Sequence, residues 1–218
     1  MKKVALISMI GLMMIALLNP TVAQQTKKEK KDLKKELKAK ADKQARKDAK
    51  KYKKDGYYVA PGALPMEKQL ENAWLKQLET DEHDYPKYIV ATGNSVGETQ
   101  TAAKLQATET AKLELAGTIT TDVAALIETN IANQQLNNEE ATSVTKTVAA
   151  AKNIIAQELG RVIPLVEMYK KIGKNVEANV RLAYDSKTAK EAAKKVIRKQ
   201  LEEETDLMHD KLDKLLDF

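Results

Sequence analysis

The feature that most constrains the fold is a stripe of apolar residues that recurs at every fourth position between residues 98 and 132. Residues four apart lie on one face of an α-helix, so the stripe predicts a long amphipathic helix there. At roughly 1.5 Å per residue such a helix extends for about 50 Å. Gly117 and the β-branched residues up to Val123 interrupt good helix formers and predict a bend. The stripe consists of Ala103, Ala107, Ala111, Leu115, Ile119, Val123, Ile127 and Ile131.

A second helix and two strands follow this long helix in the sequence. Residues 139–159 carry apolar residues at spacings of three and four, which suit packing along another helix. Residues 161–171 have a strand pattern, in which Pro164 indicates an edge position or a bulge. The clearest strand is 176–185, where strict alternation predicts that only one face is buried. The residues expected to face the helices are Val176, Ala178, Val180, Leu182 and Tyr184.

Three further elements complete the predicted fold. Residues 66–82 form a short amphipathic helix after a linker rich in Gly and Pro, and Tyr88 to Thr92 form the first strand. Ser186 is the expected N-cap of a last amphipathic helix. The order strand, helix, helix, strand, strand, helix predicts the α+β class: a small three-stranded sheet covered by long helices and preceded by a basic helical arm.

The N-terminal residues have the pattern of a secretory signal peptide. Lys2 and Lys3 precede an uncharged stretch that is mostly apolar, and Ala23 ends a short run of the small residues that signal peptidase requires. The alternative is an uncleaved membrane anchor. The fifteen residues from Val4 to Leu18 span about 22 Å as a helix, however, and a hydrocarbon core is about 30 Å thick. We therefore expect cleavage after Ala23 and export, with a periplasmic or outer-membrane-associated location.

Four segments are expected along the chain. They are a signal peptide (1–23), a basic helical arm (24–54), a linker with the short amphipathic helix (55–84), and an α+β module with a C-terminal helix (85–218). The chain has no cysteine, so disulfides, thiol catalysis and thiolate metal sites are excluded.

The arm carries most of the positive charge of the protein. Residues 27–54 contain fifteen Lys and Arg and five Asp and Glu, a net charge of +10, whereas residues 55–218 have a net charge of −6. Such a segment attracts polyanions in a salt-dependent way. Tyr52 is its only aromatic residue, which argues against stacking on single-stranded nucleic acid. The arm is therefore expected to be either a solvated spacer or a contact to an anionic envelope surface, with peripheral membrane contact included.

A match to the nucleophile motif G-x-S-x-G lies between the first strand and the long helix. It runs from Gly93 to Gly97 and places Ser95 at the nucleophile position. A serine hydrolase also needs a histidine and an acid downstream, and His209 is the only downstream histidine. We expect a turn in which the two glycines allow positive φ and close backbone approach. Catalysis by Ser95 remains an alternative.

Two other residues invite a functional interpretation. Trp74, the only tryptophan, lies on the apolar face of the short helix, so we expect it to cover an edge of the core rather than stack on a ligand. His83 lies in the acidic segment DEHD, but no second cluster supplies further metal ligands. No catalytic, cofactor-binding or metal-binding residues are assigned.

Two quoted segments resemble a known family. The first is YIVATGNSVGETQTAAKLQATETAKLELAGTI, and the second is RVIPLVEMYKKIGKNVEANVRLAYD. Together they are similar to the LPP-twenty lipoproteins of bacterial envelopes over roughly residues 85–200. The resemblance implies a small strand–helix–strand–strand module related to modules of envelope and flagellar assembly proteins, and it implies no catalytic residues. The lipidation cysteine of that family is absent here.

These observations lead to one expected function. We expect an exported, non-enzymatic envelope protein that acts as a binding or assembly module for an unknown envelope protein or an anionic envelope surface. No cofactor and no nucleic-acid partner are expected. Binding of polyanions or membrane surfaces through the basic arm is the first alternative, and a serine hydrolase using Ser95 is the second.

Overall fold

The computed structural model describes residues 20–134, 136–205 and 207–218, and side chains from residue 31 onward. Most of the predicted signal peptide lies outside the described residues. Residues 1–38 and 39–218 form two separate units, and the second is the compact body. The helices described are α1 (Pro20–Lys54), α2 (Met66–Leu78), α3 (Gln100–Gln134), α4 (Asn138–Ala150), α5 (Lys152–Glu158), α6 (Ser186–Glu204) and α7 (His209–Leu215). The strands are β1 (Tyr57–Tyr58), β2 (Tyr88–Gly97), β3 (Ile163–Ile172) and β4 (Asn175–Asp185).

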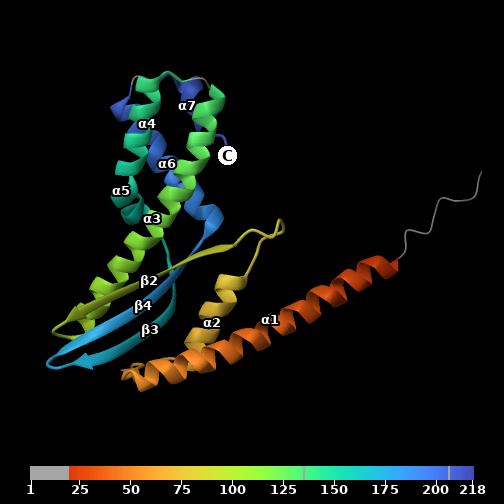
Figure 1. The fold of residues 1–218 in the computed structure, drawn as a ribbon, viewed down its shortest axis with the longest axis vertical. Coiled ribbons are helices and arrows are strands. Elements are labelled where there is room, and N and C mark those ends of the chain that lie inside the picture. The colour runs from red at the N-terminus through yellow and green to blue at the C-terminus, as the bar shows by residue number, and fades with distance from the viewer. Residues whose placement is uncertain (1–19, 135, 206) are drawn as a thin grey trace, which may run out of the picture. The chain divides into compact units, whose positions relative to one another are not determined.

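The four strands form one antiparallel sheet in the order β1-β3-β4-β2 (Figure 1). This confirms the α+β class, but the prediction of three strands is wrong. The additional strand is β1, which pairs Tyr57 with Lys170 and Tyr58 with Tyr169. Two residues in a linker rich in Gly and Pro give no strand pattern of their own. The register of strand β3 shifts between Pro164 and Val166, which fits the bulge that was one of the two expectations for Pro164.

Strand β2 is longer than predicted and includes the whole G-x-S-x-G segment. It pairs with β4 from Tyr88 opposite Asp185 to Gly97 opposite Val176, so the expected turn is an extended strand. Neither Gly93 nor Gly97 has a positive φ. Close approach is instead the reason for glycine, because a Cβ at Gly93 would lie 1.9 Å from the carbonyl oxygen of Ala107. Helix α3 therefore lies directly on the backbone of β2.

The inner face of the sheet is the face covered by α3 (Figure 1). Every apolar residue of the predicted alternation in β4 belongs to the core that this helix forms with the sheet, although Val176 is only partly buried. This confirms the predicted orientation of β4. The apolar stripe of α3 is buried as far as Ile127, where helices α4, α5, α6 and α7 complete the same core.

The outer face of the sheet is also covered, which corrects the prediction that only one face is buried. Helix α2 and the C-terminal part of α1 pack on it, so that Ala45, Ala49 and Leu70 are fully buried. Gln69 fastens α2 to the free edge of β3. Its Oε1 accepts a hydrogen bond of 2.7 Å from the backbone N–H of Glu167. The alternating pattern of β4 does not predict this layer of helices on the outer face.

The helices differ from the predicted ones mainly at their ends. Helix α3 runs unbroken through 117–123, where threonine hydroxyls such as that of Thr120 donate to carbonyls four residues earlier. Because such bonds often bend helices, a bend there stays a prediction. The N-cap of α6 is Asp185 rather than Ser186, since its carboxylate accepts a hydrogen bond from the backbone N–H of Thr188. None of the described helices is both long and apolar enough to span a bilayer.

Candidate functional site: a groove on the outer face

A cavity of about 540 Å³ lies on the outer face of the sheet, between the C-terminal end of α1, helix α2 and three strands. Its floor is polar. Lys170 of β3 and Glu177 of β4 are cross-strand partners, and Tyr57 of β1 pairs with Lys170 on the other side. Arg181 lies four residues further along β4, on the same face as Glu177 and opposite Thr92 of β2. We call this cavity the outer groove.

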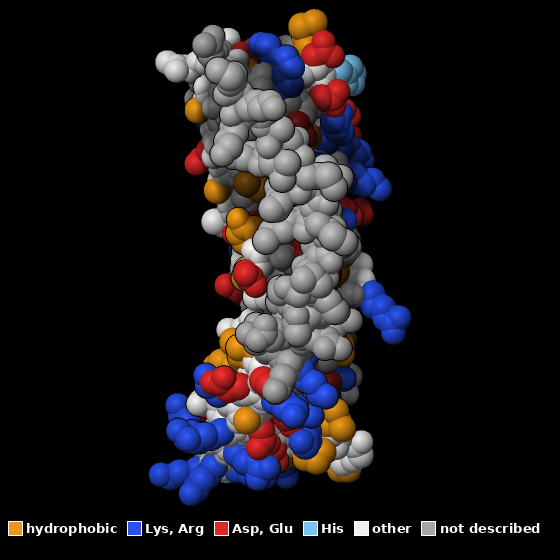
Figure 2. All heavy atoms as spheres, turned by 90° about the vertical axis from the view of Figure 1, so that its right-hand side faces the viewer, with side chains coloured by type: hydrophobic (Ala, Val, Ile, Leu, Met, Phe, Trp, Pro, Cys, Tyr) orange, Lys and Arg blue, Asp and Glu red, His pale blue; other side chains and the backbone are white. Residues whose placement is uncertain are grey.

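Two helices supply the walls of the outer groove. Helix α1 contributes Asp48, Lys51 and Tyr52, and α2 contributes Trp74. The indole N–H of Trp74 donates a hydrogen bond of 2.9 Å to Asp48, which also accepts one from Gln44. The bond from Trp74 joins the two walls, whereas the bond from Gln44 lies within α1. Figure 2 shows Lys, Arg, Asp, Glu and hydrophobic side chains intermixed at the lower end of its view, where Figure 1 places the C-terminal end of α1.

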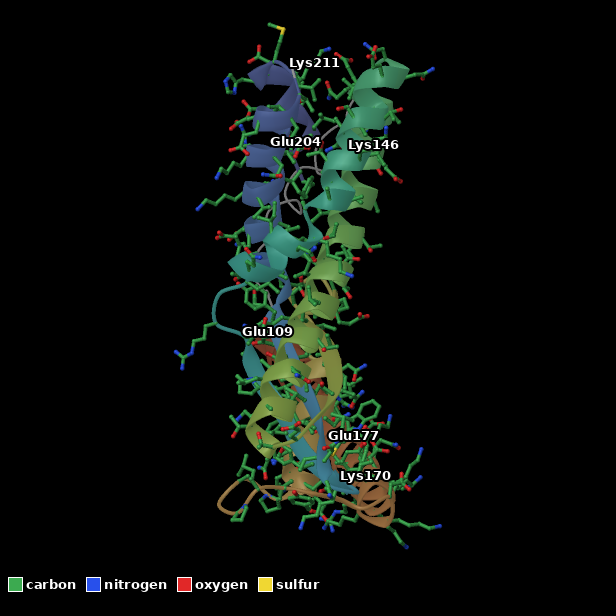
Figure 3. All side chains as sticks on the ribbon, turned by 90° about the vertical axis from the view of Figure 1, so that its left-hand side faces the viewer. Glu109, Lys146, Lys170, Glu177, Glu204 and Lys211 are labelled. Carbon is green, nitrogen blue, oxygen red and sulfur yellow. The ribbon has the colours of Figure 1, made fainter. Side chains whose placement is uncertain are left out.

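Tyr57 connects the floor of the groove to its walls. Its ring meets that of Tyr52 edge-to-face, with 5.4 Å between the centroids, and the Lys170 ammonium lies 5.6 Å from its centroid. Burial, followed by a hydrogen bond to the Glu177 carboxylate, raises the pKa of Tyr57 to about 12. The hydroxyl therefore remains a donor at neutral pH. Figure 3 shows Lys170 and Glu177 side by side on the two strands.

The middle of the floor holds polar groups whose hydrogen bonding is incomplete. Arg181 makes one hydrogen bond through Nε, to the hydroxyl of Thr92 at 3.3 Å. Asn179 lies between Glu177 and Arg181 on the same face of β4 and is only 5% exposed. Its amide nitrogen donates to Asn94 at 2.6 Å, but its Oδ1 has no partner. Buried polar atoms are seldom left without a partner in folded proteins, so this pair marks an unusual stretch of sheet.

The outer groove combines features that favour binding over catalysis. Arg and Lys side chains bind anionic groups, carboxylates accept hydrogen bonds from hydroxyls, and aromatic rings pack on flat apolar surfaces. Its size falls within the range of roughly 300–1,000 Å³ that is typical of small-molecule sites. Across the described residues, no group of three or more His, Cys, Asp or Glu is arranged to hold a metal ion.

The structure does not give Ser95 the surroundings of a nucleophile. Ser95 lies within strand β2, and its hydroxyl donates a hydrogen bond of 2.7 Å to the side-chain oxygen of Gln106 on α3. A nucleophile elbow requires a sharp turn between strand and helix and a histidine within hydrogen-bond reach. The Ser95 hydroxyl instead bonds to a side-chain amide, and the Ser95 backbone is part of a regular ladder.

The other candidates from the sequence have different outcomes. Trp74 packs against the outer-face core, as expected, but it also lines the outer groove, so the two interpretations are compatible. His83 is exposed, and its imidazole lies 3.7 Å from Glu82. His209 is exposed near Glu202, on the short helix α7. Neither histidine is among the residues of the groove.

The basic arm is divided by the boundary between the two units. Ala41, Ala45 and Ala49 are almost completely buried, so the second half of the arm packs against the body. Leu33, in the first unit, is 57% exposed. Among the described side chains of that unit, Lys31, Lys34, Lys35 and Lys38 are exposed.

Most residues of the outer groove carry no recognisable signal in the sequence. Asp48, Lys51 and Tyr52 appear as part of a charged helix, and Tyr57 appears as part of a linker. The one available signal is in β4, whose outward positions carry Glu177, Asn179 and Arg181 instead of the Lys, Thr and Ser common on solvated strands. The groove depends on which helix packs on those positions, and a strand pattern does not determine that.

Comparisons with known protein families, with curated proteins and with solved structures find no match for this chain.

Proposed function

We propose that this chain is an exported, non-enzymatic module of a bacterial envelope that binds its partner through the outer groove. The observation that carries the proposal is the groove itself: a cavity of about 540 Å³ walled by Tyr52 and Trp74 over a charged floor. The proposal of export rests on the signal-peptide pattern of residues 1–23. The proposed kinship with the LPP-twenty lipoproteins rests on the segments quoted from residues 85–200.

A second candidate function is binding of an anionic surface through the arm. Its support is the exposure of Lys31, Lys34, Lys35 and Lys38 in a segment with a net charge of +10 over residues 27–54. Each Lys or Arg near an anionic membrane contributes about 1 kcal/mol, and 1 M salt shortens screening to about 3 Å. Binding through the arm is therefore peripheral and lost at high salt.

One co-sedimentation experiment separates the two candidates. The mature chain is mixed with washed envelope particles, which contain wall polymer and membrane, at low salt and at 1 M salt. The groove variant is Tyr57→Ala, and its matched control is Tyr85→Ala, a tyrosine that is 69% exposed. The arm variant replaces Lys31, Lys34, Lys35 and Lys38 by Gln. Substitution is preferable to truncation at Asp55, because truncation removes Ala45 and Ala49 from the outer-face core.

The proposal predicts binding that Tyr57→Ala weakens and that Tyr85→Ala and 1 M salt leave largely intact. Thermal melting of each variant confirms that the fold is preserved. Binding that occurs only at low salt and is lost only in the arm variant supports the second candidate and contradicts the first. Absence of binding by the unmodified chain contradicts both.

The non-enzymatic part of the proposal has its own test. A fluorophosphonate probe labels an activated serine, and the hydrogen bond from Ser95 to Gln106 supplies no base. We expect no stoichiometric labelling. Labelling that disappears in Ser95→Ala would overturn this part of the proposal.

A further inference from the structure

We infer that the ligand of the outer groove is an acidic sugar, a hydroxyl-rich ring that carries a single carboxylate. The inference rests on the proposed function, because it names the ligand class of the same groove. It follows from three sets of side chains: cations that form no ion pair, carboxylates that accept hydrogen bonds from neutral donors, and aromatic rings.

The three cations of the groove form no ion pair among the residues that the structure describes, although Lys170 lies opposite Glu177 and three carboxylates line the same cavity. Lys51, Lys170 and Arg181 make no ion pair within 4.0 Å. Among the described residues, the Arg181 side chain hydrogen-bonds only through Nε, to Thr92, which leaves both terminal nitrogens available. A guanidinium in this state presents two parallel N–H donors, which suit the two oxygens of one carboxylate.

Three carboxylates line the groove: Asp55 follows the end of α1, and the other two accept hydrogen bonds from neutral donors. Asp48 accepts from the Trp74 indole and from the Gln44 amide, and Glu177 faces the Tyr57 hydroxyl. A carboxylate has about four acceptor positions, so each retains some for further donors. Sugar hydroxyls are such donors. The same carboxylates disfavour a doubly charged phosphate, because like charges at short range repel.

The aromatic residues supply the third part of a sugar site. Tyr52, Tyr57 and Trp74 all line the groove, although the whole chain has only nine aromatic residues. The C–H groups on one face of a sugar ring form a flat apolar surface that packs on an aromatic ring. An acidic peptide would also bind the cations. It lacks the ring hydroxyls that would donate to the carboxylates and the flat C–H face that would pack on the aromatic rings.

Trp74 makes the inference directly measurable, because it is the only tryptophan of the chain and lines the groove. Its fluorescence in the mature protein is titrated with three probes: a trimer of galacturonic acid, a neutral trimer of galactose, and an oligomer of glutamate. The groove variant is Arg181→Gln. Its matched control is Arg161→Gln, an exposed arginine in the loop before β3.

We expect the galacturonate trimer to produce a saturable change in Trp74 emission. Arg181→Gln weakens that binding about tenfold or more, as loss of a charge-assisted hydrogen bond predicts, and Arg161→Gln changes it less than about twofold. The neutral trimer and the glutamate oligomer bind at least about tenfold more weakly. The arm variant, with Lys31, Lys34, Lys35 and Lys38 replaced by Gln, leaves the emission response unchanged.

Three results would overturn the inference. If the neutral trimer binds as tightly as the galacturonate trimer, the groove recognises only the sugar ring. If the glutamate oligomer binds as tightly, the groove recognises only the negative charge. The third is no saturable response to galacturonate up to about 10 mM, a concentration that detects even very weak sites. None of the three affects groove-dependent binding to envelope particles, which Tyr57→Ala tests, so failure of the ligand class and failure of the proposed function are distinguishable.

Discussion

The two faces of the sheet are covered in different ways. On the inner face, α3 touches the backbone of β2, and Gly93 and Gly97 leave no room for even one added carbon. On the outer face, α1 and α2 pack on the sheet through apolar residues such as Ala49 and Leu70, which share a core with Ala183 of β4, and they leave a cavity of about 540 Å³. The comparison shows that the two faces of one sheet can be packed for different purposes. The inner face holds the fold together, and the outer face carries the charged groove that we propose as a binding site.

The strongest test of this contrast is a charge placed on each face. Val180→Asp buries an unpaired carboxylate under α3, where Val180 is 3% exposed, and is expected to cost about 4 kcal/mol. Val96→Lys, on the outer face of β2 opposite Glu177, is expected to change stability by less than about 0.5 kcal/mol. Urea unfolding of both variants measures the difference. Similar costs would show that the faces are equivalent.

An added methyl group tests the close contact on the inner face. Gly93→Ala places a carbon against the backbone of Ala107 and Ala111, which cannot move without shifting the helix. We expect a loss of about 3 kcal/mol, or a fall of roughly 6–12 °C in melting temperature for a protein of this size. The control is Gly160→Ala, whose new carbon would lie 3.7 Å from the Tyr184 hydroxyl, an ordinary contact. A Gly93→Ala variant as stable as this control would refute the packing described here.

High pH compares one tyrosine from each face. The pKa of Tyr57 on the outer face and that of Tyr169 on the inner face are both raised to about 12, in each case first by burial and then by a neighbouring glutamate. The unfolded chain loses these protons near pH 10, before the folded protein does. Their contribution to stability is therefore complete below pH 10 and falls as the pH rises from about 10 to about 12.

Tyr57→Phe and Tyr169→Phe are each expected to make unfolding less dependent on pH in that range. Phenolate absorbance provides a second measurement, because the raised pKa values of Tyr57 and Tyr169 delay ionisation of both hydroxyls to about pH 12. Ionisation of all seven tyrosines together near pH 10 would contradict the description of both sites.

The sequence predicts the inner face well, and for a physical reason. A strand packed on one side by a helix must alternate, and the pattern from Val176 to Tyr184 does so. The glycines of β2 were interpreted as a turn because their role depends on Ala107 and Ala111, which belong to a different element. Their local sequence contains no information about that contact.

The outer groove could not be predicted in the same way. It depends on three contacts between residues that are distant in the sequence. The end of α1 packs on the sheet, Gln69 of α2 hydrogen-bonds to β3, and Tyr57 pairs with Lys170. The two-residue strand β1 exists only because β3 offers a free edge. The charges of α1 predict a solvated helix. Leu33 is indeed exposed, but the charge pattern does not indicate that the alanines beyond residue 38 are buried.

The smallest expected effect concerns the unpaired amide on the outer face. Asn179→Leu removes a buried Oδ1 that has no partner, and it leaves the exposed Asn94 free to bond to water. The lost hydrogen bond and the removed desolvation cost nearly cancel, so we expect a change of less than about 1 kcal/mol in either direction. Destabilisation by more than about 2 kcal/mol in urea unfolding would show that the amide is needed.

The most direct measurement uses two adjacent lysines on opposite faces of β3. Lys170 lines the outer groove, whereas Lys171 is exposed and, because side chains alternate along a strand, points away from it. Each is replaced by Gln, and the affinity of the mature chain for envelope particles is measured by co-sedimentation at 1 M salt. If the outer groove is the binding face, Lys170→Gln weakens binding about tenfold and Lys171→Gln leaves it unchanged. Equal affinities of the two variants would contradict that claim.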